Sequence, residues 1–224
     1  MRSIAVFTLT EDVRDLRSLI ESYGFSLACK KPDCVIVVGG DGTYLIAERK
    51  YPEIPKLLLR KDKVSQGNVH KVLRKIHSNK FVVKRSNKIE AFVNNKKLVA
   101  ANDIIIRNAD QRRALRFSVF ASHNVHEADL IGDGVVVSTA FGSAAYFHSI
   151  TGKKFDQGIG LAFNNTTNRK KGRILPDNCV IRIKIQRETA IITADNDNTM
   201  VKAKPGDVVI VKKSKQQAQT IKLL

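Results

Sequence analysis

The chain has 224 residues, a formal net charge of +18 and three cysteines. This length suffices for one large or two small domains, and no stretch approaches the roughly 20 apolar residues of a membrane span. Because the N-terminal residues lack the features of a signal peptide and the cysteines form no Cys-x-x-Cys pair, we expect a soluble, cytoplasmic protein with buried thiols.

The positive charge is unevenly distributed along the chain. Residues 51–100 carry 13 basic and 3 acidic side chains, and residues 151–224 carry 15 and 6. Such an excess favours phosphate-rich ligands, with a solvated, lysine-rich surface suited to high temperature as the alternative. Nucleic acid is a disfavoured partner because tryptophan is absent and no DNA-binding or base-stacking pattern is present. Lys153, Lys154 and Arg173 are candidate phosphate contacts by position, although a solvated surface is the favoured interpretation of each.

The first 78 residues alternate between patterns typical of strands and of helices. Residues 34–38 have the length and β-branched content of a buried strand. In residues 11–24 the apolar side chains recur at helical spacing, and Gly24 stands where a helix would end. The alternation predicts a parallel sheet with crossover helices. We expect strands at 3–8, 34–38 and 54–59 and helices at 11–24, 43–51 and 68–78.

After residue 78 the pattern changes to short β-rich runs separated by Asn, Gly and Asp turns. Runs of this kind are typical of a mainly antiparallel β domain. We therefore predict an α/β plus all-β fold, with a Rossmann-like α/β domain at residues 1–78 and a β-sandwich-like domain at residues 79–224. The strands expected in the second domain are 80–85, 88–95, 96–108, 114–124, 134–139, 179–186, 190–195 and 207–214.

The buried run at residues 35–38 leads directly into the motif Gly39-Gly40-Asp41-Gly42-Thr43 at the start of a predicted helix. Backbone N–H groups at a helix N-terminus bind anions, and glycines let a phosphate come close. A carboxylate beside phosphates is repelled unless it shares a divalent cation or accepts a proton from an attacking hydroxyl. We therefore predict that this turn binds phosphate and that Asp41 takes part in catalysis, with a tight structural turn as the alternative.

Two further stretches follow this motif, AANDIII at Ala100–Ile106 and GDGVVVSTAFGSAAY at Gly132–Tyr146. The three stretches have the order and rough spacing seen in NAD kinases. Lipid kinases of the same superfamily share the glycine-aspartate turn but not the other two motifs. The sequence therefore resembles the NAD kinase family, as a divergent member of the kind expected from an archaeal or thermophilic organism.

The resemblance implies a two-domain enzyme, with its active site between the domains, that transfers the terminal phosphate of ATP or polyphosphate to the 2′-hydroxyl of the adenosine ribose of NAD. It also implies Mg²⁺ or another divalent cation, whose protein ligands stay unassigned, and a homodimer or homotetramer. Asp41 matches the catalytic aspartate of the family. The phosphate-binding positions by motif match are Gly39, Gly40, Gly42 and Thr43. The NAD-binding positions are Asn102, Asp103, Asp133, Ser143 and Tyr146.

The chain departs from the family pattern at Thr139–Tyr146, where NAD kinases usually read T-P-T-G-S-T-A-Y and this sequence reads T-A-F-G-S-A-A-Y. The change at Ala144 removes a hydroxyl that the family offers to the nucleotide. A kinase acting on another hydroxyl, of a lipid or a different nucleotide, and a non-catalytic nucleotide-binding protein therefore stay open as alternatives. The sequence also ends at Leu224, without the tail that many members return to their first domain.

Overall fold

The structure is a computed structural model that describes residues 1–28, 30–60, 66–122 and 125–224. Cys29 lies outside the described residues, whereas Cys34 and Cys179 are buried free thiols, as expected. Burial raises the pKa of the Cys34 thiol to about 12. No helix in the described part of the chain is long and apolar enough to cross a membrane.

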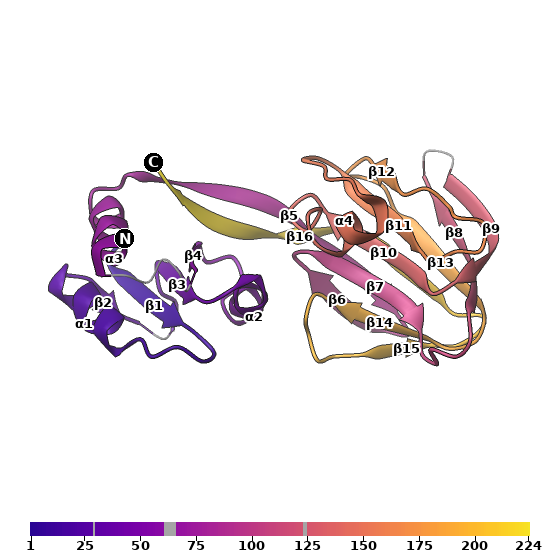
Figure 1. The fold of residues 1–224 in the computed structure, drawn as a ribbon, viewed down its shortest axis with the longest axis horizontal. Coiled ribbons are helices and arrows are strands. Elements are labelled where there is room, and N and C mark those ends of the chain that lie inside the picture. The colour runs from indigo at the N-terminus through magenta and orange to yellow at the C-terminus, as the bar shows by residue number, and fades with distance from the viewer. Residues whose placement is uncertain (29, 61–65, 123–124) are drawn as a thin grey trace. The chain divides into compact units, whose positions relative to one another are not determined.

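The chain forms two compact units, the first made of Met1–Ser86 with Gln216–Leu224 and the second of Asn87–Lys215 (Figure 1). The predicted division after residue 78 differs from these units because two long strands, β5 (Phe81–Val93) and β16 (Val208–Leu223), pair with each other and contribute to both. Residues after Lys215 therefore return to the first unit, contrary to the expectation from the sequence.

The first unit alternates strands and helices as predicted. Its sheet has the order β2-β1-β3-β4-β16, with parallel pairing throughout. Among the described residues of this segment, the two-residue strand β2 is the one addition to the predicted strands and helices. The elements are β1 (Ser3–Phe7), α1 (Arg14–Ser22), β2 (Ser26–Leu27), β3 (Cys34–Val38), α2 (Asp41–Lys50), β4 (Lys56–Leu59) and α3 (Gln66–His77).

Helices cover both faces of this sheet. Side chains of α1 and α3 pack with Ile36 and Leu57 on one face, whereas α2 packs with Val35 and Val37 on the other. Strand β3 is buried along its whole length, which explains its continuous apolar sequence. The first unit is therefore a three-layer α/β/α structure.

The second unit is a β-sandwich with one short helix. One sheet contains β16, β13, β8 and β9 in that order together with β5 and β6, and the other has the antiparallel order β12-β11-β10-β7-β14-β15. The elements are β6 (Lys96–Ala100), β7 (Asp103–Asn108), β8 (Leu115–Ala121), β9 (Val125–Gly132), β10 (Gly134–Thr139), α4 (Tyr146–Thr151), β11 (Ile159–Asn164), β12 (Arg173–Leu175), β13 (Ile181–Arg187), β14 (Ala190–Ala194) and β15 (Val201–Ala203).

The core of the second unit lies between its two sheets. Val119 and Ile183 from one sheet belong to the same buried cluster as Ile104 and Val135 from the other. Helix α4 packs through Phe147 on the opposite face of the β7–β10–β11 sheet. The predicted α/β plus β-sandwich fold class is confirmed.

Candidate functional site

The glycine-aspartate turn connects the buried strand β3 to helix α2. Gly39 has φ +148°, and a Cβ atom there would lie 2.5 Å from Oγ1 of Thr43, so glycine is required. Gly40 is the extended residue preceding the helix, and Asp41 is the first helical residue. Because the positive end of the helix dipole lies here, the turn presents a carboxylate at a place that also attracts phosphate.

Asp41 is paired with an arginine that was not predicted from the sequence. Its side chain is 72% exposed, and its Oδ1 atom accepts a hydrogen bond of 2.8 Å from an Nη atom of Arg60. Arg60 directly follows β4, which lies beside β3 with Leu59 opposite Val38. Residues that follow adjacent parallel strands lie at the same sheet edge, which is the signal that could have identified Arg60.

The described residues contain no cluster of three or more His, Cys, Asp or Glu side chains able to hold a metal ion. Mg²⁺ at phosphoryl-transfer sites is usually held by one or two carboxylates and by substrate phosphates, with water completing the shell. A single exposed carboxylate such as Asp41 fits that mode of binding, in which the cation arrives with the phosphates.

In the second unit, Asn102 and Asp103 lie at the turn from β6 to β7, directly against the end of β10. The backbone N–H of Thr139 donates to the carbonyl of Asn102 at 2.8 Å, and the hydroxyl of Ser138 donates to the same carbonyl at 3.2 Å. The Thr139 hydroxyl donates to the carbonyl of Ala101 at 2.5 Å. The second and third sequence motifs are thus joined through their backbones.

Gly142 allows the third motif to approach this turn. A Cβ atom at position 142 would lie 2.4–2.6 Å from backbone atoms of Asn102, a distance that no side chain tolerates. The backbone N–H of Gly142 donates to the Thr139 hydroxyl at 3.0 Å. The glycine of the third motif is therefore required by close packing against the second motif.

Asp195 holds the Asn102–Asp103 turn from a third segment. Its carboxylate accepts hydrogen bonds from the backbone N–H groups of Ala101, Asn102 and Asp103, at 2.8, 2.8 and 3.1 Å. The backbone N–H of Asp195 donates back to the carbonyl of Asp103 at 2.9 Å. Asp195 was not predicted from the sequence, because no local pattern shows that it reaches residues more than 90 positions away.

Asp103 is a buried carboxyl group, only 5% exposed. Burial, followed by the charge of nearby Asp195, raises the pKa of Asp103 to about 7. A group with this pKa exchanges its proton near neutral pH, whereas an exposed aspartate stays ionised there.

The other predicted NAD-binding residues contact the end of β11. Asp133 accepts a hydrogen bond of 3.1 Å from the side-chain amide of Asn165, and the hydroxyl of Tyr146 accepts one of 3.2 Å from that of Asn164. The structure therefore brings Asp133 and Tyr146 to consecutive residues. Ser143 differs, since it is buried and its hydroxyl donates to the carbonyl of Phe155 at 3.0 Å.

Comparison with known proteins identifies the family. The model of the ATP-NAD kinase C-terminal domain matches residues 101–223, more than half of the chain. An NAD kinase of Carboxydothermus hydrogenoformans is 30% identical over 87% of this chain and 75% of that protein. One of Sulfurisphaera tokodaii is 29% identical over 76% of this chain and 71% of that protein. The chain belongs to the NAD kinase family.

Solved structures of the family have the same fold. An Archaeoglobus fulgidus NAD kinase, crystallised with ATP, superposes with a TM-score of 0.81 at 17% identity, covering 100% of this chain and 94% of that one. Yeast NADH kinase, crystallised with NADH, superposes with a TM-score of 0.82 at 15% identity, covering 100% of this chain and 84% of that one. The resemblance inferred from the three sequence motifs is confirmed.

Asp195 is expected to stabilise the Asn102–Asp103 turn of this NAD kinase family member. The substitution Asp195→Asn keeps the size of the side chain but weakens its bonds to three backbone N–H groups. We expect it to lower the free energy of unfolding, measured by chemical denaturation, by about 1–3 kcal/mol. Asp129→Asn, which alters an exposed carboxylate that accepts a hydrogen bond from the side-chain amide of Gln186, is the control and should cost less. Equal losses would contradict the assigned role.

The raised pKa of Asp103 predicts a pH-dependent stability. The pKa of Asp103 is about 7 in the folded protein and 3.8 in the unfolded chain, so the folded state binds the proton more tightly between these pH values. The free energy of unfolding therefore falls as pH rises through this range. The substitution Asp103→Asn removes the titrating group and with it this pH dependence. We expect the melting temperature of the variant minus that of the wild type to increase by about 5–10 °C from pH 5 to pH 8.

The control for this measurement is Asn102→Ser, which alters the same turn without a titrating group. Its difference in melting temperature from the wild type should stay constant over the same pH range. A constant difference for Asp103→Asn as well would show that Asp103 is ionised in the folded protein throughout.

Proposed function

We propose that this chain transfers the terminal phosphate of ATP to the 2′-hydroxyl of the adenosine ribose of NAD and so produces NADP. The observation that carries the proposal is the exposed Asp41 carboxylate at the first residue of α2, on a turn that requires Gly39. Membership of the NAD kinase family supports the same reaction. The names of the relatives indicate NAD as the acceptor. The Asp41 carboxylate at the turn is a group able to act on a hydroxyl of NAD.

Asp41 acts as the general base in this proposal. Its carboxylate accepts the proton of the ribose 2′-hydroxyl while the hydroxyl oxygen forms a bond to the terminal phosphorus. The bond from that phosphorus to the bridging oxygen breaks, and ADP leaves with the electron pair. The N-terminus of α2 and the guanidinium of Arg60 supply positive charge next to Asp41 for the transferred phosphoryl group.

A divalent cation, for which Mg²⁺ is the proposed identity, neutralises charge on the phosphates when it is bound. The protein's own contribution at this point is the Asp41 carboxylate and the shape of the turn formed by Gly40, Gly42 and Thr43. Positioning and charge stabilisation, rather than covalent chemistry, are what phosphoryl transfer requires of a protein.

The acceptor dinucleotide is proposed to contact the second unit through Asn102 and Asp103. The amide of Asn102 offers both a donor and an acceptor, which suits a ribose or an adenine edge. Asp133 and Tyr146 would contribute further contacts next to Asn165 and Asn164. Ser143 is expected to contribute less to dinucleotide binding, because its hydroxyl already donates a hydrogen bond to the carbonyl of Phe155.

We propose a homodimer or homotetramer in the cytoplasm, as is common in the family, with polyphosphate as the alternative donor. Size-exclusion chromatography with light scattering measures the assembly, and a monomer at all concentrations would contradict it. Parallel assays with ATP and with polyphosphate identify the donor.

The test is an assay of the purified protein with Mg²⁺, NAD and ATP, in which NADP formation is followed. NADP formed in proportion to protein confirms the reaction. The same mixture with NADH, a lipid alcohol or another nucleotide in place of NAD tests the alternative acceptors. Thermal stabilisation by NAD without turnover on any acceptor would instead indicate a non-catalytic nucleotide-binding protein.

A further inference from the structure

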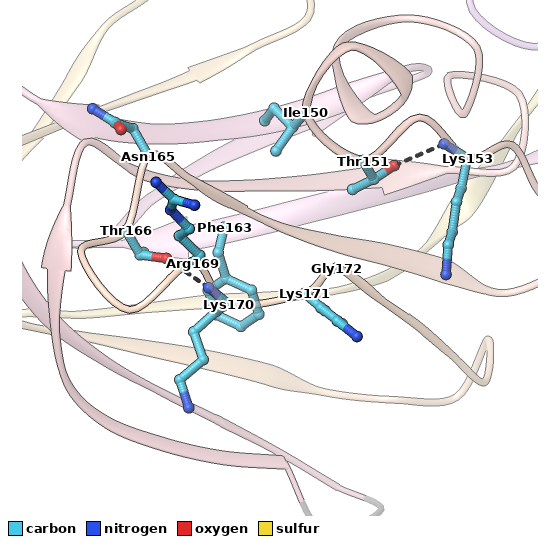
Figure 2. A pocket seen from close by; sticks show the side chains of 10 residues that line it. All are labelled: Ile150, Thr151, Lys153, Phe163, Asn165, Thr166, Arg169, Lys170, Lys171 and Gly172. Atoms are coloured by element: carbon cyan, nitrogen blue, oxygen red, sulfur yellow. Dashed lines mark hydrogen bonds between the residues drawn. The ribbon is translucent and has the colours of Figure 1, made fainter.

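A basic cavity lies in the second unit, between the end of α4 and the loop from β11 to β12 (Figure 2). Its volume is about 550 Å³, within the range of small-molecule sites. No acidic side chain of the described residues lines it. Four of its ten lining residues are cationic, and the full set is Ile150, Thr151, Lys153, Phe163, Asn165, Thr166, Arg169, Lys170, Lys171 and Gly172.

The charges of the cavity are only partly neutralised by the protein. Glu127 bonds to Lys170 at 2.5 Å and to Arg173 at 2.6 Å, and these contacts lower the pKa of the Glu127 carboxyl. Within the described residues, Lys153, Arg169 and Lys171 form no ion pair. Three positive charges therefore surround one cavity without a protein counter-charge. Arg173, a candidate phosphate contact from the sequence, is instead bound to Glu127.

The cationic residues stand on a backbone that is held in place. Thr166 is buried, and its hydroxyl accepts a hydrogen bond of 3.0 Å from the backbone N–H of Lys170. The backbone N–H of Arg169 donates to the carbonyl of Thr166 at 2.9 Å. On the other side, the Thr151 hydroxyl accepts a bond of 3.2 Å from the backbone N–H of Lys153. Ordering of the loop is thus largely complete before a ligand binds.

The cavity is separate from the predicted NAD-binding residues, none of which lines it. Asn165 connects the cavity to these residues. It lines the cavity, and its side-chain amide donates a hydrogen bond to Asp133, a predicted NAD-binding residue. A ligand in the cavity would therefore contact a residue that also contacts the proposed dinucleotide site.

We propose that this cavity binds an oligophosphate group, meaning two or more linked phosphates. Arginine binds phosphate through two parallel N–H donors and lysine as a point charge, so Arg169, Lys153 and Lys171 together match a ligand with several negative charges. Nucleic acid fits poorly, because the one aromatic ring of the cavity, Phe163, is buried and offers no stacking face. The inference does not depend on the proposed kinase reaction.

Isothermal titration of the wild-type protein with inorganic tripolyphosphate, without divalent cation and without NAD, tests the proposal. The triple variant Lys153→Ala, Arg169→Ala, Lys171→Ala should weaken tripolyphosphate binding by about tenfold or more. The matched control is Arg182→Ala, Lys184→Ala, Lys202→Ala, which removes the same three charges from exposed strand positions. It should weaken binding by less than about twofold, as expected of screened surface charges.

Two results would overturn the proposal: no detectable binding of tripolyphosphate to the wild type, or equal weakening in both triple variants. The source of the ligand follows from competition. Displacement of tripolyphosphate by ATP from the cavity indicates a nucleoside polyphosphate, and its failure indicates an inorganic one. NADP formation is measured separately on the same proteins, so a protein that binds tripolyphosphate without making NADP contradicts only the proposed function.

Discussion

Asp41→Asn is expected to lower the rate of NADP formation by about 10²- to 10⁴-fold, the range for loss of a general base. The asparagine keeps the shape of the side chain and its place at the first residue of α2, but it cannot accept the hydroxyl proton. Because Asp41 is 72% exposed and its pairing with Arg60 is a surface ion pair, stability should change by less than about 1 kcal/mol.

The matched control is Asp12→Asn, since Asp12 is also an exposed aspartate of the first unit paired with an arginine, Arg14. It should leave turnover unchanged. Thermal stabilisation by NAD should persist in Asp41→Asn, which separates loss of chemistry from loss of binding. Normal turnover in Asp41→Asn would remove Asp41 from the reaction and leave the turn with a purely structural role.

Glu48→Ala is expected to lower the free energy of unfolding by about 3–5 kcal/mol, the usual cost of leaving a buried charge without its partner. Glu48 of α2 forms an ion pair of 2.7 Å with Lys56 of β4, and their side chains are 2% and 0% exposed. The ammonium of Lys56 also donates to the carbonyl of Ile54 at 2.7 Å. Chemical denaturation of the purified proteins measures the change.

The double variant Glu48→Leu, Lys56→Met tests whether the loss comes from an uncompensated charge. Replacing both partners with apolar residues of similar volume should recover most of the stability. A double variant as unstable as Glu48→Ala would instead assign the loss to packing. Arg113→Ala, which removes an exposed arginine that pairs loosely with Asp110 and Glu188 in the second unit, is the surface control and should cost about 1 kcal/mol or less.

The parts of the fold that the sequence predicted are those with strong local patterns. Strand β3 was predicted because it is buried on both faces and is therefore apolar throughout. Helix α1 was predicted because it is buried on one face and therefore has apolar residues at helical spacing. Strands β9, β11, β12 and β15 were missed, and the single strand predicted at residues 96–108 is divided into β6 and β7. In β9 the exposed and buried residues do not alternate strictly, and β11 contains Gly160, which weakens the strand pattern.

The residues of the candidate site that could be predicted are likewise those in local sequence motifs. Asp41 and Asn102 stand in motifs whose residues are adjacent in sequence, so the sequence alone selects them. Arg60 and Asp195 act on those motifs from other segments. The position of Arg60 directly after the neighbouring parallel strand could have identified it, whereas no local pattern indicates the contact made by Asp195. The burial of Ser143 likewise depends on Phe155, twelve positions away, which the motif does not include.

The return of β16 to the first unit sets an order for folding during synthesis on the ribosome. Thr220 pairs with Lys56, and its hydroxyl lies 2.8 Å from that of Tyr44, 176 positions earlier. The second unit contains all of its own strands once Lys215 has been made, whereas the first unit, although synthesised first, still lacks an edge of its sheet. We therefore expect nascent chains that stop before Gln216 to protect the second unit from proteases while the first unit remains cleavable.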